Sequence, residues 1–253
     1  MRDLNIPYYL IGVSAIALEL LKEGIKPSRG SKDIEFAVMI SNMNEYEQIS
    51  AALVAKEFNR VAAPWTFYSD KFQVAIDVLP FGEIEENFTV NFNERYTDLH
   101  MLGFREVMEE AVPVQIEEKI ANIPPLEGMV ILKLIAWSDR PEERENDLSD
   151  ILKIIEHYYA LKWDEIVENH YDTLDKEPFD QKIIAAEVLG RKTRLYLDKS
   201  KAISERVLKV LEFNLEDASK SAIAREWARK LKVDIEYAFA LLTTFQKGIT
   251  HAA

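Results

Sequence analysis

The tripeptide Asp33-Ile34-Glu35 constrains this chain most, because it opens an extended apolar run that continues to Ile40. Alternate side chains of a strand point to the same face, so the two carboxylates would project side by side from the start of the strand. Two oxygen ligands held in this way suit Mg²⁺ bound to a nucleoside triphosphate. The run therefore predicts a β-strand whose first residues carry a metal site.

The same tripeptide recurs as Asp234-Ile235-Glu236, in a different context. The apolar residues that follow it recur at helical spacing: Ala238, Leu241, Leu242 and Phe245. On a helix, side chains at i and i+2 diverge, so this copy cannot hold one ion between its two acids. Only the first copy is predicted to bind metal.

Two further features could complete a site around Asp33. Residues 11–14, Ile-Gly-Val-Ser, read as a strand, a turn and a helix start, where Gly12 would let the backbone approach a phosphate and Ser14 adds a hydroxyl. A plain helix N-cap at Ser14 explains the same letters. Asp77 interrupts an otherwise apolar strand, and a buried carboxylate is costly unless it binds metal, is hydrogen-bonded or is paired. An exposed strand end is the alternative for Asp77.

Composition excludes several kinds of chemistry. The 253 residues include no cysteine and only four scattered histidines, which removes disulfides, thiolate catalysis and Cys- or His-based zinc sites. A net charge of −13 argues against general affinity for nucleic acid. The chain has no apolar run long enough for a transmembrane helix, and its start does not resemble a secretory signal. The expectation is a cytoplasmic protein without a membrane partner.

The charges are unevenly distributed. Residues 80–120 hold ten acids against three bases, whereas residues 187–232 hold twelve bases against seven acids. The basic stretch could be an acceptor surface, and the acidic stretch could attract a cationic substrate. Solvated faces of ordinary helices explain both stretches equally simply.

The chain is predicted to hold two domains of different class, divided at Pro124-Pro125. Residues 1–123 read as α+β: strands near 8–11 and 33–40, a helix capped by Asn44 with Glu47, a hairpin of 65–69 with 72–79, a loop-rich stretch at 80–97, and one more strand within 112–123. Residues 124–253 show helical spacing throughout. The expected fold is a mixed sheet with flanking helices, followed by an all-helical domain.

Taken in order, these pieces resemble the polymerase-beta-type nucleotidyltransferase superfamily. The chain is most similar to the AbiEii/AbiGii toxin nucleotidyltransferases: residues 9–18 resemble their opening "vGGtAlal" segment, and residues 29–35 their "R-x-[ST]-x-D-[IL]-[DE]" segment. Residues 132–140 resemble their "lKL.Aw.dR" helix, and residues 147–150 the "D-l-x-D" that follows. The resemblance covers about residues 8–155 and implies a nucleotidyltransferase fold. Two departures are Val13, where the family has a second glycine, and Asn146, where a basic residue is common.

The resemblance implies a role for each matching residue. Asp33, Glu35 and Asp77 are implied as the ligands of two Mg²⁺ ions that come with the NTP, with Asp77 as candidate base. Gly12, Ser14 and Lys133 are implied as phosphate contacts. Arg29 and Ser31 are implied to touch nucleotide or to order their loop, and Asp147 to pair with Lys133 or a nearby arginine. On its own, Lys133 reads as a lysine whose stem lies along an apolar helix.

The implied function is Mg²⁺-dependent transfer of a nucleoside monophosphate from an NTP to an acceptor hydroxyl. RNA, such as a tRNA 3′ end, is the suspected acceptor, with an antitoxin protein as a further partner in a toxin–antitoxin pair. One alternative is an adenylyltransferase for a small, antibiotic-type molecule. The other, motivated by Val13 and Asn146, is a nucleotide-binding module without catalysis.

Overall fold

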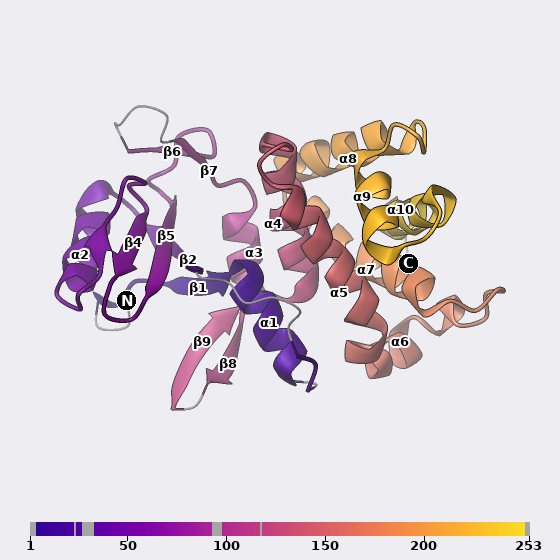
Figure 1. Cartoon of the computed structure of the whole chain (residues 1–253), viewed down its shortest axis with the longest axis horizontal. Helices are drawn as coiled ribbons and strands as arrows, with labels where there is room; N and C mark the ends of the chain where they lie inside the picture. Colours follow the sequence, from indigo (N-terminus) through magenta and orange to yellow (C-terminus); the bar gives the residue numbers. More distant parts are fainter. Residues whose placement is uncertain (1–3, 23, 27–32, 93–97, 117, 251–253) are drawn as a thin grey trace. The chain divides into compact units, whose positions relative to one another are not determined.

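A five-stranded mixed sheet organises the first half of the chain (Figure 1). The structure is a computed structural model that describes residues 4–22, 24–26, 33–92, 98–116 and 118–250. The chain divides into two units, Met1–Pro125 and Leu126–Ala253. The first unit is α+β and the second is built from helices, so the predicted fold class is confirmed.

The strands of the sheet follow the order β1-β2-β5-β4-β3. Their bounds are β1 Tyr8–Ile11, β2 Asp33–Ile40, β3 Asn59–Arg60, β4 Thr66–Ser69 and β5 Val74–Gly82. Strands β2 and β5 are parallel, and the other neighbours are antiparallel. The predicted hairpin is present as β4 and β5. Buried side chains of the three central strands, including Val38, Phe67 and Val78, fix which face each strand turns inward.

Strand β5 is longer than predicted and takes in Pro80, which was expected in a loop. Proline cannot donate a ladder hydrogen bond, and a central strand normally excludes it. Here β4 pairs with β5 only as far as Asp77, so the last residues of β5 have β2 alone as a ladder partner. The missing N–H of Pro80 can therefore be tolerated, because this end of β5 has a ladder partner on one side only.

Helices and two small hairpins complete the first unit. The helices are α1 Gly12–Lys22, α2 Met43–Val54 and α3 Phe104–Glu109. The hairpins are β6 Thr89–Asn91 with β7 Asp98–His100, and β8 Val112–Ile116 with β9 Lys119–Ile123. Residues 112–123 thus form two strands rather than one, and the loop-rich stretch contains a short strand.

Both predicted N-caps in this unit are wrong. Ser14 lies inside the first turn of α1, because the helix already begins at Gly12. Helix α2 is capped by Asn42 rather than Asn44: its side chain accepts a hydrogen bond from the Glu45 amide at 3.2 Å, while Glu45 Oε2 accepts from the Ser41 amide at 2.8 Å. The reciprocal bonding of a capping box is present, two residues earlier than the sequence suggested.

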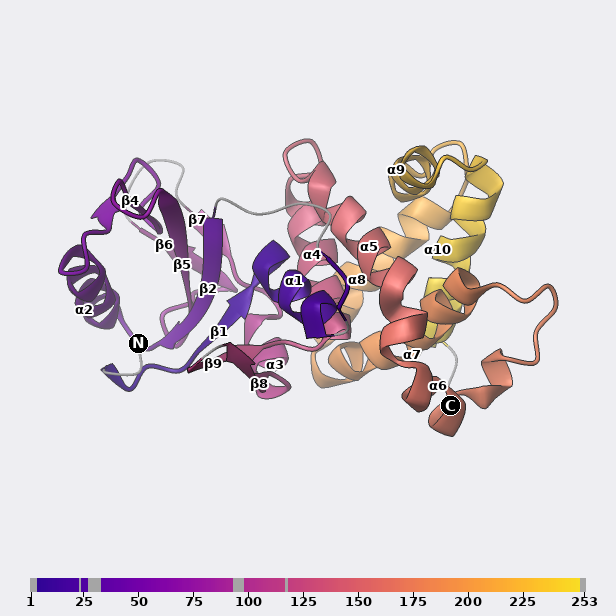
Figure 2. The ribbon, with the colours of Figure 1, turned by 60° about the horizontal axis from the view of Figure 1, so that its bottom comes forward.

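The second unit has seven α-helices and one 3₁₀ turn among its described residues (Figure 1). Their bounds are α4 Leu126–Asp139, α5 Glu145–Leu161, α6 Trp163–Asn169, η2 Tyr171–Thr173, α7 Gln181–Lys199, α8 Lys201–Leu215, α9 Ala222–Leu231 and α10 Ile235–Thr250. Helices α7 and α10 lie side by side (Figure 2). A Cβ on Gly190 would lie 2.2 Å from the Phe245 carbonyl oxygen, and one on Gly248 would lie 2.2 Å from that of Glu187. Two glycines therefore let these backbones touch.

Among the described residues, no helix combines the length and the apolar character needed to cross a membrane.

Candidate functional site

The carboxylate of Glu35 lies against the backbone of Gly12. Ile11, at the end of β1, is the register partner of Glu35 on β2, and Gly12 follows with φ +67° as the first residue of α1. A Cβ on Gly12 would lie 1.5 Å from Glu35 Oε2, so the carboxylate fills the space that any other side chain would need. The start of a helix favours negative charge, and this turn brings the acid there.

Glu35 and Asp77 are neighbours across two parallel strands. They are register partners on β2 and β5, so their side chains emerge on the same face of the sheet. Asp77 is also opposite Thr66 on β4, whose Oγ1 donates a hydrogen bond of 2.5 Å to Asp77 Oδ1. The hydroxyl fixes one oxygen of Asp77 and leaves the carboxylate half-buried.

Asp33 lies two residues before Glu35 on the same strand, and therefore on the same face. Its register partner on β5 is Ala75, and Asp33 itself is exposed. Within the described ranges, no three histidine or acidic side chains are grouped so that they could hold one metal ion. Mg²⁺ is usually held by one or two carboxylates together with substrate phosphates and water. The acids of this face fit that pattern, in which the substrate completes the ligand set.

The remaining phosphate contacts predicted near the sheet are only partly described. Ser14 is half-buried in the first turn of α1. Arg29 and Ser31 lie outside the described residues. Val13 is the second residue of α1, so the turn contains a single glycine, and Glu35 covers it. The need for glycine at position 12 is thus explained within the chain.

The second copy of the tripeptide behaves as the sequence predicts. Helix α10 begins at Ile235, and Asp234 stands just before it, where Oδ1 accepts a hydrogen bond of 2.7 Å from the Tyr237 amide. Asp234 therefore caps a helix, while Glu236 follows in its first turn.

Lys133 lies in the helical unit, on α4, and forms a buried ion cluster there. Its Nζ donates to Asp147 Oδ1 at 2.9 Å and to Asp150 Oδ2 at 2.7 Å, both on α5. The lysine is only 8% exposed. Burial by itself lowers the pKa of Lys133, but the charges and hydrogen bonds of Asp147 and Asp150 outweigh it and raise that pKa above its ordinary value. Arg144 approaches the other oxygen of Asp147 at 3.5 Å.

The predicted pairing of Asp147 with Lys133 is therefore present, and a nearby arginine joins it. Sequence reasoning missed Asp150 as the second partner, although the spacing carried the signal: 147 and 150 are three apart on a helix and share a face. It also missed Thr66, because the predicted hairpin, with Asp70-Lys71 as its turn, places Thr66 opposite Ala75, whereas the structure pairs it with Asp77.

Several bases of the stretch 187–232 are engaged in ion pairs inside the helical unit. Arg191 bonds to Asp172 at 2.6 Å and to Glu187 at 2.8 Å, and Arg206 bonds to Asp139. Lysines at the junction of α7 and α8, and further along α8, are exposed: Lys199, Lys201 and Lys209. The positive surface of this stretch is therefore smaller than its sequence suggests.

Comparisons with known proteins leave the family open. No protein-family model matches the chain, and no curated protein does. Among solved structures, the chain is similar to the solution structure of the antibiotic-resistance factor ANT(2'')-Ia, with a TM-score of 0.35 and 11% identity over 68% of this chain and 91% of that one. It is also similar to an antigenic nucleotidyltransferase-like protein from Paracoccidioides brasiliensis, with a TM-score of 0.39 and 11% identity over 67% and 84% of the two chains. Likenesses this remote carry no argument about activity.

Proposed function

We propose that the chain is a Mg²⁺-dependent nucleotidyltransferase that moves a nucleoside monophosphate from an NTP to an acceptor hydroxyl. One observation carries the proposal: Glu35 and Asp77 stand side by side on parallel strands, and Glu35 lies at the glycine turn that starts α1. Two carboxylates side by side on one face of a sheet are oxygen ligands of the kind that the Mg²⁺ of a nucleotide complex uses.

The face formed by Asp33, Glu35 and Asp77 would bind two Mg²⁺ ions together with the triphosphate. When bound, these ions supply the positive charge that phosphoryl transfer requires. Asp77 would orient the acceptor hydroxyl and take its proton, and the Thr66 hydrogen bond would keep one Asp77 oxygen in place. The acceptor oxygen would bond to the α-phosphorus while the bond to the β-phosphate oxygen breaks, which releases pyrophosphate.

The proposed nucleotide contacts outside the acids are Gly12, Ser14, Arg29 and Ser31. Lys133 is proposed to reach a phosphate, but it would have to loosen two carboxylate bonds to do so. Asp147 would then serve to hold Lys133 between turnovers.

For the acceptor we propose RNA, such as a tRNA 3′ end, within a toxin–antitoxin pair. The exposed lysines Lys199, Lys201 and Lys209 are what supports an RNA contact. Replacing all three with glutamate is expected to reduce labelling of RNA from α-labelled NTP by about tenfold or more, because phosphate contacts dominate such affinity. Unchanged RNA labelling would exclude this surface. Labelling of a small cationic acceptor, with none on RNA, would favour the antibiotic-type alternative.

A second candidate, a nucleotide-binding module without catalysis, is favoured by a specific observation. The Glu35 carboxylate occupies the space over Gly12, and Val13 replaces a second glycine. Both features narrow the approach of a phosphate to the turn. Binding of NTP without release of pyrophosphate, across RNA and small acceptors, would support this candidate.

The first test is calorimetry of all four NTPs with and without Mg²⁺, on wild type and on Asp33→Asn/Glu35→Gln. We expect Mg²⁺-dependent binding of at least one NTP and a loss of at least tenfold in the variant. Mg²⁺ alone is expected to bind weakly, because the part of the chain that the structure describes groups no three acidic or histidine side chains around one ion position.

The repeated tripeptide supplies the matched control. Asp234→Asn/Glu236→Gln removes the same two charges from the same three letters, at the start of a helix instead of a strand. NTP affinity should be unchanged in this control. Equal losses in both variants would mean that net charge, rather than the sheet face, governs binding, and binding that survives Asp33→Asn/Glu35→Gln would place the nucleotide elsewhere.

A further inference from the structure

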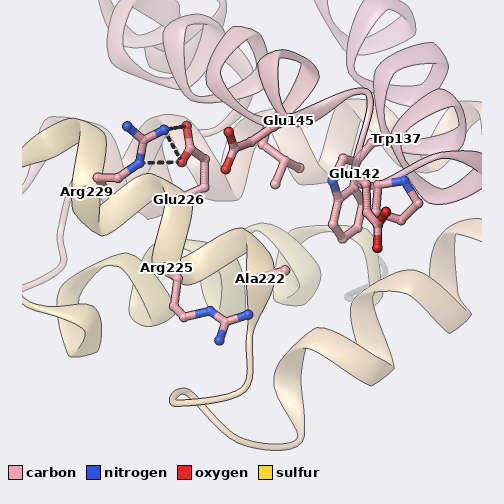
Figure 3. A pocket seen from close by; sticks show the side chains of 9 residues that line it. Trp137, Glu142, Glu145, Ala222, Arg225, Glu226 and Arg229 are labelled. Carbon is pink, nitrogen blue, oxygen red and sulfur yellow. Dashed lines mark hydrogen bonds and ion pairs between the residues drawn. The ribbon is translucent and has the colours of Figure 1, made fainter.

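A pocket of about 320 Å³ lies wholly within the helical unit, apart from the acids of the sheet (Figure 3). Its apolar lining combines Pro141 and Ala222 with Trp137 on α4 and Leu148 on α5, which are 7% and 2% exposed and so present only a small part of their surface. Small-molecule pockets start at about 300 Å³ and are mostly apolar, with a few charged groups that fix orientation. The volume suits a compact ligand with one ring or one branched chain.

The charges around the pocket divide into an internal pair and an unused set. Glu226 is buried and is bonded by Arg229, through Nε at 2.8 Å and Nη2 at 2.7 Å, and by Ser149 Oγ at 2.9 Å. Figure 3 shows the Arg229–Glu226 bonds along α9. Arg229 and Glu226 neutralise each other's charge, so they have little hydrogen-bonding capacity left for a ligand.

The unused charges have opposite signs and come from different elements. Arg225 lies on α9 and is exposed, and no ion pair or side-chain hydrogen bond of its guanidinium is found within the described residues. Glu142, which follows Pro141 in the α4–α5 loop, likewise has no ion pair or side-chain hydrogen bond within the described residues. Glu145, at the start of α5, has none either, although, after the hydrogen bonds to Glu226, its charge helps to raise the pKa of Arg229. Figure 3 shows the two acids on the α4–α5 side of the pocket and Arg225 on α9. A ligand bound here meets Arg225, next to the Arg229–Glu226 pair, on one wall and two acids on the other.

We infer that this pocket binds a small zwitterion with an apolar body, of the chemical class of an apolar α-amino acid. The carboxylate of the ligand pairs with Arg225, whose planar fork suits two parallel bonds to a carboxylate. Its ammonium pairs with Glu142 and Glu145, and its side chain packs on Trp137 and Leu148. This inference does not depend on the proposed nucleotidyl transfer, because no residue is shared.

Three probes, tested on the whole 253-residue chain, separate the contributions of the ligand's carboxylate and ammonium groups. They are L-phenylalanine, 3-phenylpropanoate, which lacks the ammonium, and 2-phenylethylamine, which lacks the carboxylate. Saturation-transfer NMR and calorimetry at millimolar ligand would report binding. The zwitterion is expected to bind about tenfold more tightly than either single-charge analogue, the difference that one charge-assisted bond makes.

Variants of the charged pocket residues are tested against each of the three ligands. Arg225→Gln should weaken phenylalanine and phenylpropanoate about tenfold and leave phenylethylamine unchanged, whereas Glu142→Gln/Glu145→Gln should do the reverse for the two analogues. Lys220→Gln and Glu212→Gln are controls that change exposed charges outside the pocket and should alter nothing. Circular dichroism checks that each variant is folded.

Three results would overturn the inference. The first is no binding of phenylalanine at millimolar concentration. The second is equal affinity for all three probes, and the third is an Arg225→Gln variant that binds phenylalanine as wild type does.

Discussion

Two clusters of acids, one in each unit, show how differently the same residue type can be used. In the sheet, Glu35 and Asp77 lie beside each other on β2 and β5, against Gly12. In the helical unit, Asp147 and Asp150 share the buried ammonium of Lys133. The helical cluster contains its own counter-charge and so has a structural explanation. The sheet cluster places two carboxylates side by side on one face, with one Asp77 oxygen held by the Thr66 hydroxyl.

Removing the Lys133 cation should have the largest effect, because it leaves Asp147 and Asp150 as buried like charges. Lys133→Met is expected to destabilise the helical unit by about 3–5 kcal/mol. Hydrogen exchange of peptides from α4 and α5, measured in the full chain, would locate the loss. Lys133→Met/Asp147→Asn/Asp150→Asn should recover most of it. A cost below about 1 kcal/mol for Lys133→Met would contradict a structural role for the cluster.

A substitution at Gly12 tests whether Glu35 really is packed against the turn. Gly12→Ala adds a Cβ where Glu35 Oε2 lies, at a positive φ, and should cost about 2–3 kcal/mol in urea unfolding. Gly24→Ala is the matched control, since Gly24 has φ +70° and nothing within 4 Å of the added Cβ. That control should cost only about 1 kcal/mol, the strain of the backbone alone.

The double variant Gly12→Ala/Glu35→Ala separates the two causes. Shortening Glu35 removes the clash and leaves the strain, so the double variant should be more stable than Gly12→Ala. If Gly12→Ala and Gly24→Ala cost the same, Glu35 is not held rigidly at the turn and its carboxylate moves aside for the added Cβ.

Alkaline pH should lower the stability of the cluster around Lys133, because its lysine loses its proton there. This effect is expected to be smaller than that of the substitutions above. The pKa of Lys133 is raised in the folded protein, so the folded state holds this proton more tightly than the unfolded state. The stability it contributes is complete below the ordinary lysine pKa of about 10.4 and is lost as the pH rises through the folded value. Above about pH 10, wild type should therefore lose more stability with rising pH than Lys133→Met does. Parallel curves for the two proteins would show that Lys133 does not titrate with folding.

The sequence predicted the strands of the sheet cluster well, because apolar runs mark strands. β1, β2 and the β4–β5 hairpin are present near the predicted positions, although β5 is longer than predicted. The grouping of Asp77 with Glu35 was implied only by the family resemblance, and the pairing of β2 with β5 makes the two residues neighbours. In the helical cluster the sequence predicted one of the two partners of Lys133, namely Asp147. Asp150 was missed because its contact with Lys133 depends on how α5 packs against α4, which the sequence alone does not give.

Local capping was predicted less well than the strands, for a physical reason. Ser14 and Asn44 both have side chains that can cap a helix, but nearby residues such as Asn42 do too. Which residue becomes the N-cap depends on where the first helical turn begins, and the sequence defines that position poorly. Gly12 was predicted as a phosphate turn, yet the space it leaves is filled by Glu35. Only the fold could show that the two motifs, twenty-three positions apart, meet.

The smallest expected effect on stability comes from replacing one aspartate by asparagine in each cluster. Asp77→Asn keeps the shape and still lets Thr66 Oγ1 donate to Oδ1, but it removes one of two adjacent negative charges. It should raise stability by about 0.2–1 kcal/mol, most clearly at low salt. Asp147→Asn makes the same change beside Lys133 and should lower stability by about 1–3 kcal/mol. Thermal unfolding of both variants at two salt concentrations would measure these shifts, and a loss of stability in both would mean that Asp77, like Asp147, is held by a cation of the chain itself.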